Sequence, residues 1–259
     1  MGGHEMIDFV GAGPGAADLI TVRGMKLIED ADVIIYAGSL VSPKLLEYAE
    51  RDPQIYNSAK MTLEEVTDVM IAADKEGKRV VRLHTGDQSI YGAVREQMDI
   101  LDEHGIEYSS TPGVSACFGA AAALNMEYTL PGVSQTLIIT RMEGATPVPA
   151  DESIEELAKH HASMAVYLST GMLEELSGRL VAGGYDRSDV AALVYKATHP
   201  DEKIFLCKIE DLAQVAAQNG ITKTALVLVG DAVSHKLYDR SKLYDPTFET
   251  GYRKARDRA

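Results

Sequence analysis

The sequence feature that most constrains the fold is Thr85-Gly86-Asp87, which directly follows the apolar, strand-like run 79–84. A glycine at the end of a strand lets a ligand approach the backbone. The carboxyl ends of strands are also where open α/β sheets bind small molecules. A helix is expected to follow at once, over 90–103. Two interpretations stay open here: a ligand site, or a tight strand-to-helix turn in which Asp87 caps the helix.

A second glycine-rich turn favours the ligand site. The short apolar run 6–10 enters Gly11-Ala12-Gly13-Pro14-Gly15, and a helical pattern begins soon after. The turn is similar to a dinucleotide-binding fingerprint, but Ala16 stands where a further glycine is needed. Pro14 has no N–H to offer a phosphate. The next strand-like run, 32–36, ends without an acidic residue for a ribose. The sequence therefore argues against NAD as the ligand.

Strands alternate with helices along the chain, which is typical of an α/β fold with mainly parallel sheets. Strands are expected near 6–10, 33–37, 79–84, 106–110, 135–140, 165–168, 190–195, 203–207 and 225–229. Capping signatures at 62–65 and 153–156 and an Ala-rich run at 114–124 mark helices. The sequence predicts an N-terminal α/β domain (1–113), a helix and linker (114–134), a C-terminal α/β domain (135–233) and a packed extension (234–259), with a cleft between the domains.

Composition limits the class of protein. The chain has 259 residues, of which 46% are hydrophobic, enough for one large core or two modest ones. No apolar stretch reaches the about 20 residues of a membrane span, and the N-terminus lacks a signal-peptide layout, so a cytoplasmic protein is expected. A net charge of −14 argues against nucleic acid as a partner. Cys117 and Cys207 lack the spacing of a metal or redox motif, so neither a disulfide nor a metal site is expected.

Four separated motifs resemble those of a known family. They are Gly11-Ala12-Gly13-Pro14-Gly15, Tyr36-Ala37-Gly38-Ser39-Leu40-Val41-Ser42, His84-Thr85-Gly86-Asp87-Gln88-Ser89-Ile90-Tyr91-Gly92 and Thr111-Pro112-Gly113-Val114-Ser115-Ala116. The chain resembles, over nearly its whole length, the tetrapyrrole methylases, which use S-adenosylmethionine to methylate uroporphyrinogen and the corrin precursors of vitamin B12. Segments 36–41, 140–149, 195–203 and 240–248 are similar to the precorrin-4 C11-methyltransferase branch.

The resemblance implies a fold, a reaction and a cofactor. It implies two α/β domains of the class III S-adenosylmethionine methyltransferase type, with the active site in the cleft between them. The implied reaction is methylation of C11 of precorrin-4, or of its cobalt complex, in cobalamin biosynthesis. The family also implies a homodimer. Positioning a nucleophilic carbon against an activated methyl supplies much of such catalysis, so no catalytic triad or paired carboxylates are expected, and the catalytic residues stay unassigned.

The family's cofactor contacts carry over by motif to residues of this chain. The implied S-adenosylmethionine contacts are Pro14, Thr85, Gly86, Asp87, Ile90, Ser115, Ala116, Met142, Leu168, Ala197, Thr224 and Ala225. Ser115 and Ala116 open a helix, where free N–H groups suit the methionine carboxylate. The resemblance places Leu168, Ala197, Thr224 and Ala225 on the adenine side of the cofactor. Ser115 as a helix cap and Met142 as a core residue remain structural alternatives.

The residues that bind the substrate must offset the net negative charge of the protein, because corrin precursors carry many carboxylates and would be repelled by it. A Debye length of about 8 Å at physiological salt allows local cations to dominate. The candidate substrate contacts are Tyr36, Ser39, Arg141 and Lys196, each with a solvated surface role as the alternative. Relatives acting on uroporphyrinogen have an Asp in the loop where this chain has Ala37-Gly38-Ser39. Its absence argues against that substrate and leaves the proton acceptor unidentified.

Other functions remain open on the sequence. The nearest is methylation of another corrin precursor. Methylation of ribosomal RNA or of a modified histidine in an elongation factor is disfavoured by the charge. A carrier or sensor that binds a tetrapyrrole without catalysis is a third alternative. His84, beside the Gly-Asp turn, could relay a proton or serve the structure. The sequence does not decide whether the substrate already contains cobalt.

Overall fold

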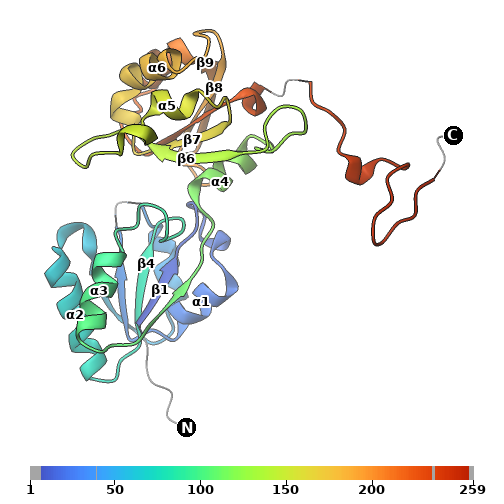
Figure 1. Ribbon diagram of the computed structural model, residues 1–259. Coiled ribbons are helices and arrows are strands. Elements are labelled where there is room, and N and C mark those ends of the chain that lie inside the picture. Colours follow the sequence, from blue (N-terminus) through green and yellow to red (C-terminus); the bar gives the residue numbers. More distant parts are fainter. Residues whose placement is uncertain (1–6, 39, 235–236, 257–259) are drawn as a thin grey trace. The chain divides into compact units, whose positions relative to one another are not determined.

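The computed structural model describes residues 7–38, 40–234 and 237–256 (Figure 1). The chain forms two compact units. The first holds the described residues up to Ala120 together with Lys196–Glu202, and the second holds the rest. Each unit has its own five-stranded sheet with helices, so both are α/β as expected. The domain boundaries at 113, 134 and 233 stay a prediction.

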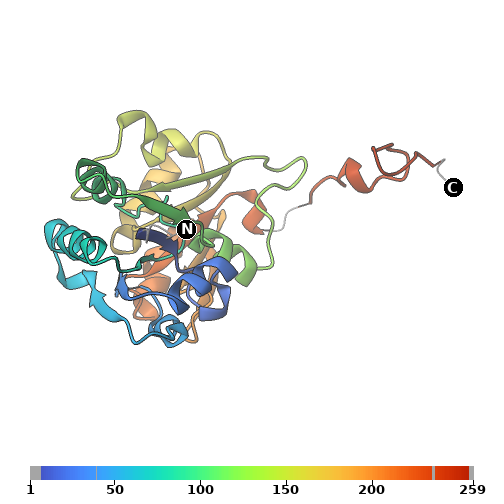
Figure 2. The same ribbon diagram turned by 90° about the horizontal axis from the view of Figure 1, so that it is seen from below.

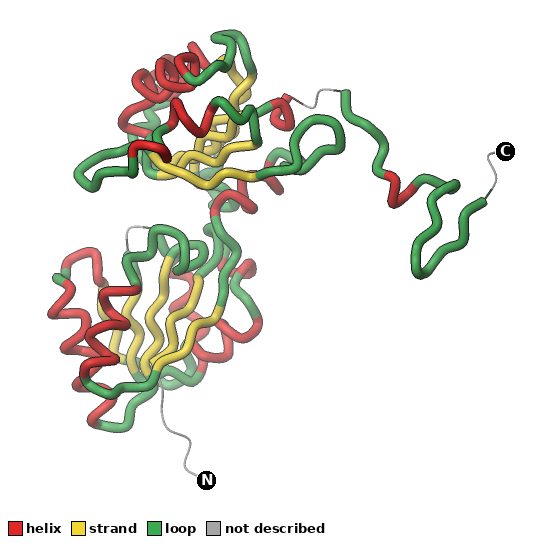
Figure 3. The backbone as a smooth tube through the Cα atoms, in the orientation of Figure 1, coloured by secondary structure: helices red, strands yellow, loops and turns green. Residues whose placement is uncertain are grey.

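The first sheet is parallel throughout. Its strands are β1 (Ile7–Gly11), β2 (Val33–Tyr36), β3 (Gln54–Asn57), β4 (Val80–His84) and β5 (Tyr108–Thr111), in the order β3-β2-β4-β1-β5. The predicted strands are confirmed, but β3 was missed because it is a short, largely polar edge strand. Strands β4, β1 and β5 are neighbours, so the loops after them emerge side by side. In Figure 3 the strands of this sheet lie between helices on both sides.

Helices cover both faces of the first sheet (Figure 1, Figure 2). Helix α1 (Val22–Glu29) packs Ile28 against one face, while α2 (Leu63–Lys75) and α3 (Arg95–Glu103) pack against the other. The capping box predicted for α2 is present, because the Thr62 side chain accepts from the Glu65 N–H and the Glu65 carboxylate accepts from the Thr62 N–H. Successive residues of β1 pack in two hydrophobic cores, one on each face of the sheet: Phe9 lies in the core under α2 and α3, and Val10 lies in the core under α1.

The helix expected from Ile90 is wrong at its start, because α3 begins only at Arg95. Tyr91 and Ala93 have φ values of 55° and 49°, in the left-handed region that ends a right-handed helix. Gly92 lies between them, and a Cβ there would be 2.2 Å from the carbonyl oxygen of Gln88. The segment is therefore a tight turn that lengthens the loop after β4.

The second sheet is mixed. Its strands are β6 (Leu137–Arg141), β7 (Ser163–Tyr167), β8 (Val190–Tyr195), β9 (Lys203–Lys208) and β10 (Ala225–Val229), in the order β6-β7-β10-β8-β9. Only β6 and β7 are parallel, and the other three pairings are antiparallel. The expectation of a mainly parallel sheet is wrong here. A parallel crossover needs about a dozen residues or more, and the connection from β8 to β9 is too short for one.

One face of the second sheet is covered by α5 (Ile154–Ala158), α6 (Leu173–Ala182) and α7 (Leu212–Gln218). Helix α4 (Ala116–Ala123) spans the division between the units. In the C-terminal extension the side chains of Leu237 and Tyr252 are fully exposed, so the expectation that it packs is wrong for them. Within the described ranges, no helix is long and apolar enough to cross a membrane.

Candidate functional site

Three glycine-containing loops meet at the carboxyl edge of the first sheet. The Gly86 N–H donates to the Gly13 carbonyl at 2.9 Å, and the Gly13 N–H donates to the Gly86 carbonyl at 3.2 Å. A Cβ on Gly11 would lie 2.5 Å from the nitrogen of Gly113, and one on Gly113 would lie 2.1 Å from the oxygen of Gly86. The backbones after β1, β4 and β5 therefore stack so closely that side chains are excluded.

Asp87 ties two of these loops together. One carboxylate oxygen accepts from the Gly113 N–H at 2.8 Å, and the other accepts from the Ser89 N–H at 2.9 Å and from the Ser89 hydroxyl. Burial by itself raises the pKa of Asp87, but the hydrogen bonds from Ser89 and Gly113 outweigh it and lower the pKa below its ordinary 3.8. The helix-capping interpretation is wrong, because α3 begins at Arg95 with no side-chain cap.

The other predicted cofactor residues of this region lie around the same edge. Ser115 is buried at the start of α4, and a Cβ on Gly86 would lie 3.4 Å from its Cα. Pro14 is buried close to Gly119 of the same helix. Thr85 and Ile90 are half-buried in the loop after β4, and Ala116 is the first residue of α4. The structure thus brings together the predicted contacts of the first unit.

The predicted contacts of the second unit gather at one edge of the second sheet. Met142 and Leu168 follow the parallel strands β6 and β7, while Thr224 and Ala225 begin the antiparallel strand β10. Met142 is buried, whereas Leu168 is 64% exposed. Leu168 and Thr224 have φ values of 53° and 63°. Non-glycine residues are uncommon in that region of conformational space, and such residues cluster at functional sites.

Two hydroxyls that the sequence analysis missed hold this edge in place. The Ser169 hydroxyl, which is buried, accepts from the Met142 N–H at 2.9 Å and donates to the Tyr167 carbonyl at 2.6 Å. The Thr170 hydroxyl donates to the Ala225 carbonyl at 3.1 Å and accepts from the Ala225 N–H at 3.2 Å. The signal in the sequence is a Ser-Thr pair just beyond a buried strand.

Two of the four predicted substrate contacts, Arg141 and Lys196, are engaged within the protein. The Arg141 guanidinium donates to the carbonyls of Met142, Thr146 and Pro147 at 3.0–3.1 Å. The Lys196 ammonium lies 2.6 Å from the Asp201 carboxylate, in the segment Lys196–Glu202 that also contains the buried Ala197. Tyr36 is half-buried at the end of β2. Ser39 lies outside the described residues. Their roles toward a substrate stay a prediction.

His84 has a structural environment. Its ring is buried and stacks on Phe9, with the ring centroids 6.2 Å apart. Burial, assisted by the positive charge of Arg82, lowers the pKa of His84 to about 3. The imidazole is therefore neutral near pH 7, and with so low a pKa it is a weak base that does not readily take up a proton to pass on. The structural alternative is favoured over proton relay.

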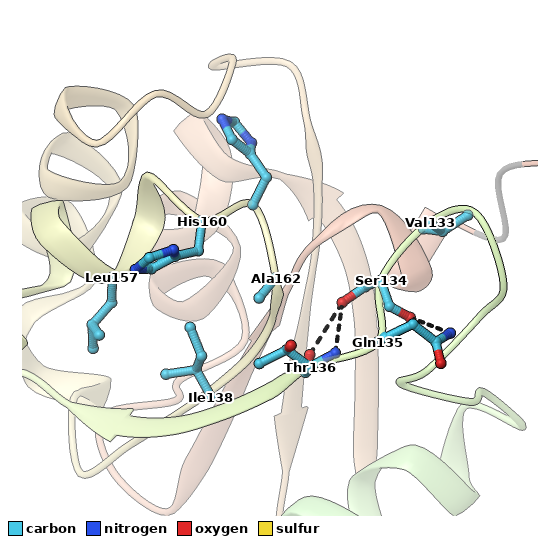
Figure 4. Close-up of a pocket in the computed structure, with 9 residues that line it drawn as sticks. Val133, Ser134, Gln135, Thr136, Ile138, Leu157, His160 and Ala162 are labelled. Atoms are coloured by element: carbon cyan, nitrogen blue, oxygen red, sulfur yellow. Dashed lines mark hydrogen bonds between the residues drawn. The ribbon is translucent and has the colours of Figure 1, made fainter.

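A pocket of about 510 Å³ lies elsewhere in the second unit (Figure 4). Its lining residues come from 133–138 and 157–162, at the start of β6 and the end of α5, and include none of the predicted contacts. Figure 4 shows local hydrogen bonds among three of its polar residues: the Ser134 hydroxyl bonds the Thr136 backbone, and the Gln135 amide donates to the Ser134 carbonyl. The pocket is therefore a weaker candidate than the glycine-lined edge.

Asp87→Asn should lower the free energy of unfolding at pH 7, because an amide has one oxygen and can accept from only one of the two N–H groups, of Ser89 and Gly113, while its nitrogen faces the other, donor against donor. The pKa of Asp87 is lower in the folded protein, so the stability that its carboxylate contributes is complete above the unfolded pKa of about 3.9 and is lost as the pH falls through the lowered value. Urea titrations at pH 7 and near pH 3 measure this effect, and the difference in unfolding free energy between the wild-type protein and the variant should be smaller at the lower pH. Asp186→Asn is the control, since Asp186 accepts from the Ser188 N–H and hydroxyl in the same kind of local turn but, within the described part of the chain, bonds no second loop. A deficit for Asp87→Asn that is independent of pH would contradict the assignment.

Comparison with known proteins agrees with this architecture. The family model described as Tetrapyrrole (Corrin/Porphyrin) Methylases matches residues 6–213. A relative from Methanocaldococcus jannaschii named cobalt-precorrin-4 C(11)-methyltransferase is 52% identical over 98% of both chains. A precorrin-4 C(11)-methyltransferase from Sinorhizobium is 40% identical over 95% of this chain and 98% of its own. The X-ray structure of a cobalt precorrin-4 methyltransferase, a cobalamin biosynthetic enzyme, matches with a TM-score of 0.87 and 43% identity over 90% of this chain and 98% of its own. The chain therefore belongs to the tetrapyrrole (corrin/porphyrin) methylases.

Proposed function

We propose that the chain transfers the methyl group of S-adenosylmethionine to C11 of cobalt-precorrin-4, a step of cobalamin biosynthesis. The observation that carries the proposal is the 52% identity, end to end, with a relative named for that reaction. The relative named for the precorrin without cobalt is 40% identical, which favours the cobalt complex as substrate. A homodimer and a cytoplasmic location belong to the same proposal: the family resemblance supports the homodimer, and the sequence pattern of the chain supports the location.

The residues at the edge of the first sheet fit S-adenosylmethionine by their chemistry. Asp87 is held ionised, so it can accept hydrogen bonds from an ammonium or from ribose hydroxyls. The N-terminal end of α4, at Ser115 and Ala116, suits a carboxylate. In the second unit the exposed side chain of Leu168 offers apolar surface to an aromatic base. When bound, the cofactor supplies an electrophilic methyl on a positively charged sulfur.

The residues of the chain contribute to catalysis by holding the reacting groups in position. Holding two reacting groups in the right geometry can supply roughly 7–11 kcal/mol of a barrier, provided that the site is rigid. The stacked backbones at Gly11, Gly86 and Gly113 supply that rigidity, and Asp87 locks the loop after β4 onto the loop after β5. His84 takes no proton-transfer role in this proposal, because it is buried and neutral.

The substrate carboxylates need local cations in a protein of net charge −14. Lys196 is suited to this because its ion pair with Asp201 is partly exposed. Exposed pairs contribute only about 0–1 kcal/mol, so Lys196 can exchange Asp201 for a substrate carboxylate. Arg141 is held by three backbone carbonyls, which fix the direction of its guanidinium at the edge of the second sheet.

The reaction itself is the first test. With S-adenosylmethionine and cobalt-precorrin-4, the purified protein should give one product heavier by a single methyl, and a carbon-13 label from the methyl donor should appear at C11 by NMR. Uroporphyrinogen III should be a poor substrate, because the loop after β2 lacks the Asp of the relatives that use it. Label at another ring carbon, or efficient turnover of uroporphyrinogen, would place the chain in another branch of the family.

Asp87→Ala should weaken the binding of S-adenosylhomocysteine by at least about tenfold, equal to about 1.4 kcal/mol, because it removes a negative acceptor and frees the loop after β4. Isothermal titration calorimetry measures this directly. Asp186→Ala is the matched control, since it breaks the same kind of turn away from the predicted site. Equal affinities in a folded Asp87 variant would remove Asp87 from the cofactor site.

Replacing Lys196 or Arg141 by Gln should raise the KM for the corrin precursor and leave the affinity for S-adenosylhomocysteine unchanged, because a lost uniform binding contact appears in KM. Steady-state kinetics with varied corrin substrate is the measurement. Lys159→Gln is the control, because Lys159 also pairs with one exposed carboxylate, that of Glu156. An unchanged KM in both variants would return the two residues to purely structural roles.

A further inference from the structure

The loop that joins β8 to β9 has an unusual placement and conformation. The segment Lys196–Glu202 belongs to the first unit, although both flanking strands belong to the second sheet. Lys196 and Thr198 have φ values of 47° and 67°. Thr198 is β-branched, and such residues are genuine outliers in the left-handed region. A conformation of this kind persists only where the surroundings hold it.

Hydrogen bonds hold the loop and tie it to the turn after β1. The Thr198 N–H donates to the Glu202 carboxylate at 2.6 Å, and the His199 N–H donates to the Lys196 carbonyl at 3.0 Å. The Thr198 hydroxyl accepts from the Ala16 N–H at 3.0 Å. Thr198, the residue with the strained backbone, is thus also the residue that hydrogen-bonds Ala16, directly after the glycine-rich turn 11–15.

The His199 ring lies directly over Gly15. A Cβ on Gly15 would be 2.3 Å from Cδ2 and 2.6 Å from Nε2 of that ring, and 2.9 Å from the Ala197 carbonyl oxygen. The φ of Gly15 is outside the left-handed region, so glycine is needed here for space and not for backbone conformation. On the other side of the turn, a Cβ on Gly119 of α4 would lie 2.7 Å from Pro14 and 3.4 Å from the Thr198 methyl.

We infer that His199 is a positioning residue, whose ring, presented by the strained Thr198, presses the turn at 14–16 against α4 and so sets the shape of the cofactor site. The inference rests on the proposed function, because Pro14 of that turn is a predicted cofactor contact. Burial lowers the pKa of His199, and although Asp201 opposes this effect, Lys196 adds to it. The ring is therefore mainly neutral at neutral pH and acts by packing rather than by charge.

The test is a double-mutant cycle between Gly15 and His199. Gly15→Ala should weaken S-adenosylhomocysteine binding by at least about tenfold, because the new methyl collides with the ring. His199→Ala should weaken it by about threefold and raise the KM for S-adenosylmethionine, with the KM for the corrin precursor unchanged. In Gly15→Ala/His199→Ala the collision with the ring is gone and only the 2.9 Å approach to the Ala197 carbonyl oxygen is left, so the double variant should bind more tightly than Gly15→Ala alone, and its loss should be well below the sum of the two single losses. Gly178→Ala is the matched control, because a Cβ there meets nothing within 4 Å.

Additive losses in the double variant would overturn the inference, since the ring would then not be what Gly15 makes room for. If Gly15→Ala does not fold, His199→Ala still decides: a lower melting temperature with unchanged cofactor affinity would make His199 merely structural. Failure of the wild-type protein to bind S-adenosylhomocysteine would instead overturn the proposed function. In that case the same cycle in melting temperatures would still test the packing of His199 on Gly15.

Discussion

The structure depends on the close contact of bare backbone at the carboxyl edge of the first sheet. Gly11 and Gly113 bring the loops after neighbouring strands within distances at which a Cβ would overlap a main-chain atom, and the carbonyl oxygen of Gly86 is one of the atoms that it would meet. Protein interiors are packed as densely as organic crystals, so a displacement of one loop also moves the loops that are packed against it. The loops therefore behave as one rigid element, and Asp87 reinforces it by bonding two of them through a single carboxylate.

The second unit builds its edge differently. Leu168 and Thr224 adopt left-handed backbone without being glycine, which costs of order 1–3 kcal/mol for each residue. The hydroxyls of Ser169 and Thr170 bond the neighbouring strand ends and offset part of that cost. Residues forced into unfavourable conformations at adjacent strand ends are typical of a site whose shape matters more than local stability. The same reasoning applies to Thr198 in the loop between β8 and β9.

Sequence patterns predicted most of the regular elements, because buried strands and capped helices have local signatures. The capping box at Thr62 and the apolar run of β10 are examples. The patterns failed at two places in particular. Helix α3 starts late because a tight local turn, in which Gly92 lies against Gln88, precedes it. The direction of strands β8–β10 follows from connection lengths and pairing partners, and neither is visible in a hydrophobic pattern.

The sequence by itself determined the family and the positions of its motifs, because the spacing of the glycines and the short motifs at the ends of strands can be read directly from the sequence. It also placed Asp87 at a strand end beside a glycine, and so at the carboxyl edge of the first sheet. Only the tertiary structure decided what these residues touch: that Asp87 bonds Gly113, that Arg141 and Lys196 are already engaged, and that His199 fills the space over Gly15. For Asp87 and His199 the physical reason is separation along the chain, because their contacts join residues that are brought together only when the protein folds. Arg141 and Lys196 bond residues within their own loops, and the folded shape of those loops, which no residue pattern specifies, decides those bonds.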